Sequence, residues 1–123
     1  MKKIAVVEDN PDNRLLVQAI LDDRYEISEY ETGADAVAGL GSDRPDLILL
    51  DISLPEMDGT EVLAWIREQP DIKDTPVIAL TAHAMAGDRE KYLRAGFNDY
   101  VTKPIVDEAV LHEAIERWLS KEE

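Results

Sequence analysis

The segment DLILLD at residues 46–51 places four aliphatic side chains in a row and closes on an aspartate. An unbroken apolar run of this length is typical of a strand covered on both faces, because a strand with one wet face alternates apolar and polar residues. The runs at 4–7 and 77–80 have the same character. Together they predict the middle of a parallel sheet with helices on both sides.

Helix-period segments separate these runs. Asn10 and Pro11 offer a side-chain cap and a first-turn proline to a helix over 11–23. The other amphipathic segments are 34–40, 59–69, 83–95 and 110–119. The more polar run 25–30 predicts an edge strand, and 99–102 predicts a fifth strand. This alternation predicts a doubly wound α/β fold, a five-stranded parallel sheet flanked by five helices.

Length and composition limit the possibilities. With 123 residues, 45% of them hydrophobic, the chain suits one domain over 1–123 with a core of its own. It has no cysteine, which excludes disulfides and thiolate metal sites. The Met1 start and the charged end at 120–123 favour a complete protein.

The net charge of −14 repels phosphate backbones and anionic lipid headgroups. We therefore expect no nucleic-acid partner and no membrane partner. No apolar run approaches the ~20 residues of a membrane span. Acidic residues follow the N-terminus too soon for a secretory signal, so the prediction is a cytoplasmic protein.

Polar residues stand where the predicted strands end: Glu8, Asp9, Asp51, Thr81 and Lys103. In doubly wound sheets, ligands bind outside these carboxyl ends. Carboxylates about 4 Å apart repel by roughly 4 kcal/mol at an effective dielectric near 20, so such a cluster needs a cation. Oxygen donors favour Mg²⁺, or Mn²⁺, which takes the same ligands.

A metal ion, the Lys103 ammonium and the Thr81 hydroxyl around Asp51 suit a tetrahedral dianion. Asp51 would be the nucleophile that forms an aspartyl phosphate, and Glu8 and Asp9 would hold the metal ion. Taken singly, each residue has an ordinary alternative as a helix cap or a surface charge. Only the combination favours phosphoryl chemistry.

Three stretches carry a resemblance to a known family: EDNPDN at 8–13, DLILLDISLPEMDG at 46–59 and PVIALTAHAMAGDREKYLRAGFNDYVTKPI at 76–105. The motifs and their spacing resemble a response-regulator receiver domain of two-component signalling, over about residues 3 to 119. The chain is most similar to stand-alone receivers and to those attached to hybrid kinases. The resemblance implies a flavodoxin-like sheet with strand order 2-1-3-4-5.

The resemblance also implies a role for each site residue. Asp51 is the expected phosphoacceptor, and Thr81 and Tyr100 are the expected switch pair. The backbone carbonyl of Ser53 joins the acidic residues as a metal ligand, and Lys103-Pro104 is expected to be a cis peptide. Glu8 stands where many relatives have Asp.

The function that the resemblance implies is a single-domain response regulator. Its phosphoryl donor would be the phosphohistidine of a histidine kinase or histidine phosphotransfer protein, and it would catalyse its own modification and hydrolysis. Output would be by protein contact or phosphorelay, because no residues remain for an effector domain. The segment 83–95 has a thin apolar stripe, so the fourth helix, fifth strand and fifth helix would form the partner face.

Three alternatives belong to other classes. An Asp-nucleophile phosphohydrolase needs a second carboxylate as general acid and a cap, whereas Ser53 stands two residues after Asp51 and no cap-sized insertion is present. A phosphorylation-independent binding module on the same fold predicts that Asp51→Asn leaves signalling intact. A nucleotide or flavin site is disfavoured, because no glycine-rich loop follows the first strand.

Overall fold

The computed structural model describes residues 2–54, 57, 59–82, 88–103 and 108–120. Its strands form one parallel sheet in the order β2-β1-β3-β4-β5, which confirms the predicted topology and the predicted edge position of β2. The strand bounds are β1 Lys3–Val7, β2 Glu26–Tyr30, β3 Leu47–Asp51, β4 Val77–Thr81 and β5 Asp99–Thr102.

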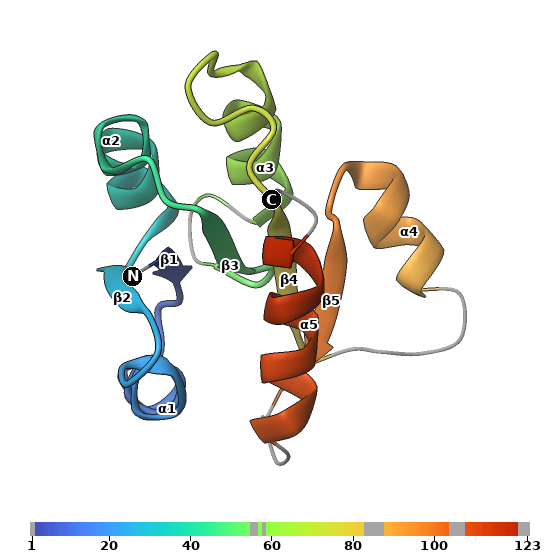
Figure 1. Cartoon of the computed structure of the whole chain (residues 1–123). Coiled ribbons are helices and arrows are strands. Elements are labelled where there is room, and N and C mark those ends of the chain that lie inside the picture. The colour runs from blue at the N-terminus through green and yellow to red at the C-terminus, as the bar shows by residue number, and fades with distance from the viewer. Residues whose placement is uncertain (1, 55–56, 58, 83–87, 104–107, 121–123) are drawn as a thin grey trace.

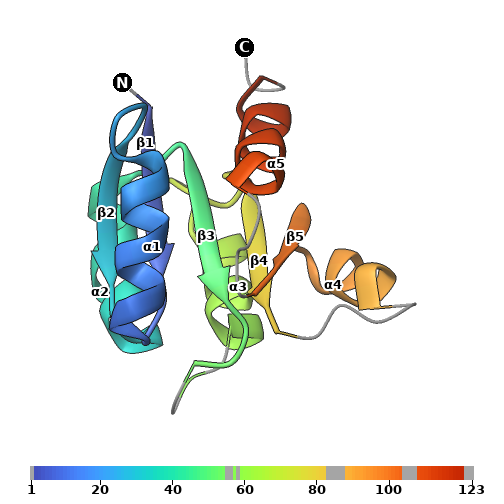
Figure 2. The same cartoon turned by 90° about the horizontal axis from the view of Figure 1, so that it is seen from below.

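Helices cover both faces of the sheet (Figure 1). Their bounds are α1 Pro11–Leu21, α2 Gly33–Asp43, α3 Gly59–Glu68, α4 Asp88–Ala95 and α5 Glu108–Ser120. Figure 2 shows α1 and α5 in front of the sheet and α2 and α3 behind it, which is the doubly wound arrangement. The predicted fourth helix began at about 83; residues 83–87 lie outside the described residues, and α4 is described from Asp88.

The central strands feed two separate cores, one on each side. On β1, Ile4 and Val6 pack in the core that contains α1 and α5 residues, whereas Ala5 and Val7 pack in the core that contains α2 and α3 residues. Successive side chains of a strand point to opposite faces. A strand that serves both cores therefore has no polar alternation, which is why the apolar runs predicted the sheet.

The helix ends follow partly from local sequence. The Asn10 side chain accepts hydrogen bonds from the backbone N–H groups of Asp12 and Asn13, at 2.8 and 3.2 Å, so the predicted cap of α1 is confirmed. Helix α2 runs on to Asp43, beyond the predicted end at residue 40, and is closed by Arg44 at φ 48°.

Because every strand is parallel, the polar residues that follow them meet at one edge of the sheet. Asp51 is paired in register with Leu80, and Thr81 with Thr102. The Lys103 N–H donates to the Thr81 carbonyl oxygen at 2.7 Å, which brings the end of β5 beside the end of β4. Within the described residues, the structure has no helix with the length and apolar character needed to cross a membrane.

Candidate functional site

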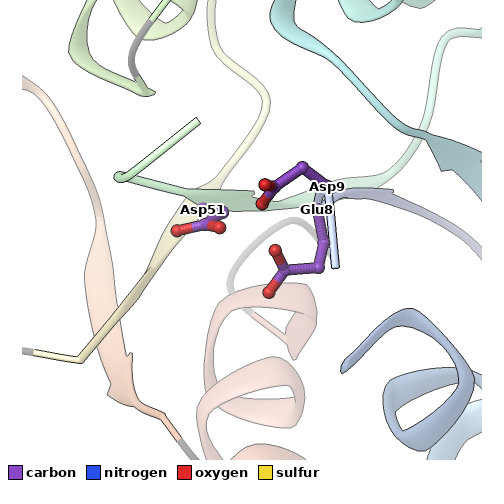
Figure 3. Close-up of side chains that lie close together, drawn as sticks. All are labelled: Glu8, Asp9 and Asp51. Atoms are coloured by element: carbon purple, nitrogen blue, oxygen red, sulfur yellow. The ribbon is translucent and has the colours of Figure 1, made fainter. Parts of the chain in front are cut away.

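Three carboxylates gather at this edge. Glu8 and Asp9 directly follow β1, and Asp51 is the last residue of β3. One carboxylate oxygen from each lies within 4.8 Å of the others, and Figure 3 shows the three groups facing a common space. Glu8 and Asp51 are buried, whereas Asp9 is exposed. The cluster is therefore buried at Glu8 and Asp51 and open to solvent at Asp9.

Lys103 joins the two buried acids. Its Nζ lies 3.0 Å from Oε1 of Glu8 and 3.0 Å from Oδ2 of Asp51. The other Asp51 oxygen, Oδ1, accepts a hydrogen bond from the Ser53 N–H at 2.9 Å. The alternatives of a surface lysine and a solvated Glu8 are thus wrong, and Asp51 makes a local turn contact in addition to its contact with the ammonium.

The protonation of this group follows from its burial. Burial raises the pKa of Glu8 to about 7, and a hydrogen bond with Asp51 adds to the effect against the opposing influence of Lys103. Burial also acts to raise the pKa of Asp51, but hydrogen bonds from Glu8, Ser53 and Lys103 outweigh it and hold that pKa below its usual range. Asp51 is therefore the more acidic of the two carboxyl groups, and Glu8 is the one that titrates near neutral pH.

This proton makes the stability of the metal-free protein depend on pH. The pKa of Glu8 is about 7 in the folded chain and 4.5 as an ordinary side chain, so its contribution to stability is complete below about 4.5 and lost as pH rises through 7. The loss amounts to about 3 kcal/mol. We expect the free energy of unfolding, measured by urea titration with a chelator present, to fall between pH 5 and pH 8.

The Glu8→Gln variant is the control for this prediction, because an amide of the same shape cannot titrate. Its unfolding free energy should vary much less over the same pH interval. An equal fall in the variant and the wild type would contradict the assignment of the raised pKa to Glu8.

The donor set suits a hard divalent cation. Three carboxylates supply the oxygen ligands that Mg²⁺ prefers, and the exposed Asp9 leaves a side where water ligands can enter. Burial and the neighbouring Asp51 carboxylate raise the pKa of Glu8 in spite of the Lys103 ammonium. A further cation at this place would therefore be stabilised.

Thr81 makes a contact that sequence reasoning missed. Its buried Oγ1 lies 3.0 Å from the hydroxyl of Tyr92 on α4. The Tyr92 ring packs against Tyr100, with 5.9 Å between ring centroids, and edge-on against Phe97. Among the described α4 side chains, at 90–95, Tyr92 is the buried one. The sequence feature that could have indicated this contact is Tyr92 itself, a residue with a hydroxyl group in the thin apolar stripe of this helix.

Two predicted features are not tested by this geometry. Pro104 lies outside the described residues, so the cis Lys103-Pro104 peptide stays a prediction. The part of Ser53 that the structure places against the cluster is its N–H, and the role of its carbonyl oxygen also stays a prediction.

Gly59 packs directly against the backbone that carries Asp51. Its N–H donates to the Ile52 carbonyl oxygen at 3.0 Å. A Cβ at this position would lie 2.5 Å from the Asp51 carbonyl oxygen and 2.7 Å from the Ile52 Cα. The glycine is therefore required by this close approach of two main chains.

The Gly59→Ala variant is expected to lose about 3 kcal/mol of unfolding free energy in urea titration, because backbone has to shift to admit the methyl group. Gly41→Ala is the matched control. A Cβ at residue 41 meets nothing within 4 Å, so this change within α2 should stabilise the protein by roughly 0.5–1 kcal/mol. Equal effects of the two substitutions would contradict the close approach at Gly59.

Known proteins with similar sequences include receiver domains and response regulators. The family model for the response regulator receiver domain matches residues 4–116. The histidine-protein kinase BarA of Escherichia coli (strain K12) is 44% identical over 116 residues, which cover 94% of this chain and 12% of that kinase. The response regulator DivK of Brucella anthropi is 40% identical over 105 residues, which cover 85% of each chain.

Solved structures share the fold closely. The receiver domain of the sensor histidine kinase PA1611 from Pseudomonas aeruginosa PAO1 superposes with a TM-score of 0.87 at 40% identity, covering 97% of this chain and 98% of that one, and its magnesium ion is coordinated in the active-site cleft. Chemotaxis protein CheY4 of Vibrio cholerae gives a TM-score of 0.87 at 28% identity, covering 95% of this chain and 98% of that one. Since the family match spans most of the chain and the fold superposes on these solved structures, the chain belongs to the response regulator receiver domain family.

Proposed function

We propose that this chain is a single-domain response regulator that accepts a phosphoryl group on Asp51 from a phosphohistidine donor. The observation that carries the proposal is the state of Asp51. Its carboxylate is buried and ionised, and it lies 3.0 Å from the Lys103 ammonium and beside two further acids. A carboxylate held in this way is a nucleophile with a cation in place for the charge of an incoming phosphoryl group.

The proposed reaction uses this chain's own groups. An Asp51 oxygen attacks the phosphorus atom, the P–N bond of the donor breaks, and its electron pair stays on the imidazole. Lys103 neutralises charge on the phosphoryl oxygens, and the Thr81 hydroxyl donates to one of them. Water later attacks the phosphorus atom and restores Asp51 with release of inorganic phosphate.

Glu8, Asp9, Asp51 and the Ser53 carbonyl would hold Mg²⁺, which when bound neutralises the charge that develops on the phosphoryl oxygens. The magnesium ion in the PA1611 receiver supports this choice. Mn²⁺ prefers the same oxygen donors and stays a prediction from ligand chemistry alone.

The proposed partners follow from the relatives. BarA is a histidine-protein kinase and DivK a response regulator, so the donor would be a histidine kinase or a histidine phosphotransfer protein. Output would be contact with a downstream protein through the α4, β5 and α5 face, or relay of the phosphate, in the cytoplasm. The match to DivK, which covers 85% of each chain, supports the proposal that residues 1–123 form one receiver domain.

The test uses phosphoramidate, a small donor with the P–N bond that phosphohistidine also has. After incubation with Mg²⁺, the intact mass of the protein should rise by one phosphoryl group, and peptide mapping should place that group on Asp51. A chelator should prevent the gain. No gain, or modification elsewhere, overturns the proposal. Steady hydrolysis of a phosphate ester would instead support the phosphohydrolase alternative.

A further inference from the structure

The short segment that follows β1 carries two of the three acids of the cluster. It lies beyond the end of the strand, because β1 ends at Val7 and the acids are the next two residues. One backbone tie to the sheet is present: the Glu8 N–H donates to the Tyr30 carbonyl oxygen at 3.0 Å. The carbonyl oxygens of the segment need other partners.

Arg14, the fourth residue of α1, supplies those partners. Its Nη1 donates to the Glu8 carbonyl oxygen at 2.9 Å and to the Asp9 carbonyl oxygen at 3.2 Å. One nitrogen of the guanidinium therefore bonds the backbone of both acids at once. The side chain is 14% exposed, which is low for an arginine near a protein surface.

The rest of the guanidinium is anchored to β2 and to the residue after it. Nε lies 3.4 Å from Oε2 of Glu29, and Nη2 lies 3.3 Å from Oε1 of Glu31. A planar group held along two edges has little freedom to turn. Arg14 is thus fixed by β2 and in turn fixes the backbone of Glu8 and Asp9.

We infer that Arg14 is a positioning residue for the metal site: it holds the Glu8 and Asp9 backbone so that their carboxylates face Asp51 before a cation arrives. This inference rests on the proposed function, which places Mg²⁺ among these acids. Replacing a residue that orients metal ligands without binding the metal itself typically lowers metal affinity by about 10–100-fold.

The charge of Arg14 and its positioning role predict opposite changes in Mg²⁺ affinity when Arg14 is replaced. Arg14 is a cation close to the site, so Coulomb's law alone predicts that its removal strengthens Mg²⁺ binding. Loss of positioning predicts weaker binding, because the acids then have to be ordered when the ion binds. The sign of the change therefore separates the two explanations.

The experiment measures Mg²⁺ affinity of the whole chain by isothermal titration calorimetry at one pH and ionic strength. Arg14→Gln should raise the dissociation constant by about tenfold. Arg14→Lys keeps the charge but loses the planar fork, so it should also weaken binding. The control is Arg24→Gln, which removes the same charge from a surface pair with Glu116 at 3.1 Å and should not weaken binding.

A second readout excludes a general loss of structure. In the metal-free Arg14→Gln variant, backbone amide chemical shifts should change over 8–10, while those of β4 and α3 stay as in the wild type. Magnesium binding by Arg14→Gln that equals or exceeds the wild type overturns the inference.

The mass assay with phosphoramidate on the same proteins separates this outcome from failure of the proposed function. Wild-type phosphorylation combined with unchanged Mg²⁺ affinity in Arg14→Gln defeats only the inference. Weakened Mg²⁺ binding in the variant, without phosphorylation of the wild type, defeats only the proposed function. A wild type that binds no Mg²⁺ overturns both.

Discussion

The Asp51→Asn variant is expected to gain no phosphoryl group under conditions in which the wild type is fully modified. An amide oxygen is a poor nucleophile, and the substitution also removes the negative charge that Lys103 contacts at 3.0 Å. Intact-mass measurement after treatment with phosphoramidate and Mg²⁺ gives the result directly.

Asp46→Asn is the matched control, because Asp46 precedes the same strand at the opposite end of the sheet. Its Oδ2 accepts a hydrogen bond from the Lys3 N–H at 2.7 Å, far from the acidic cluster in the register of β3. This variant should be phosphorylated like the wild type. Phosphorylation of Asp51→Asn to the wild-type extent would exclude Asp51 as the acceptor.

The Asp51→Asn variant has a second expected effect, on the pH dependence of stability. The hydrogen bond and the charge of Asp51 both raise the pKa of Glu8, so Asp51→Asn should lower that pKa. The fall in unfolding free energy between pH 5 and pH 8 should become smaller. An unchanged fall would show that burial alone sets the pKa of Glu8.

The Lys103→Met variant should slow phosphorylation by about 10²–10³-fold, because the transferred group loses a preorganised positive charge. It should nevertheless bind Mg²⁺ more tightly, since the ammonium no longer competes for the Glu8 and Asp51 oxygens that it contacts. Mass spectrometry over time measures the rate of phosphorylation, and calorimetry measures the affinity.

Lys73→Met is the control for the loss of one positive charge. Lys73 is exposed and precedes β4, at the end of the sheet away from the cluster. The phosphorylation rate and the magnesium affinity of Lys73→Met should both stay close to those of the wild type. Weaker magnesium binding in Lys103→Met would mean that Lys103 orders the acids rather than competing with the ion.

The sheet could be predicted from sequence because burial leaves a direct trace there. The runs 47–50 and 77–80 lack polar residues because both of their faces are covered, and all eight of these positions are buried in the structure. The end of α2 was predicted too early. Glycine at 39 and 41 weakened the helical pattern. In the structure, Gly39 packs against the Tyr30 ring, and a Cβ added at residue 39 would lie 2.6 Å from that ring.

The gathering of Glu8, Asp9, Asp51 and Lys103 was also predictable, because parallel strands place their carboxyl ends at one edge. The contacts of individual side chains were not. Whether Glu8 is buried depends on how helices pack over it, and local sequence does not record that packing. The roles of Arg14 and Tyr92 likewise depend on partners distant in the chain.

The attachment of α4 has a consequence for how the molecule fluctuates. Helix α3 buries several residues, whereas among the described α4 side chains, at 90–95, burial falls on Tyr92. A transient local opening of α4 therefore exposes little apolar surface and costs less free energy than the opening of α3. Since the hydroxyl of Tyr92 also lies 3.0 Å from Oγ1 of Thr81, detachment of the helix breaks this contact at the end of β4.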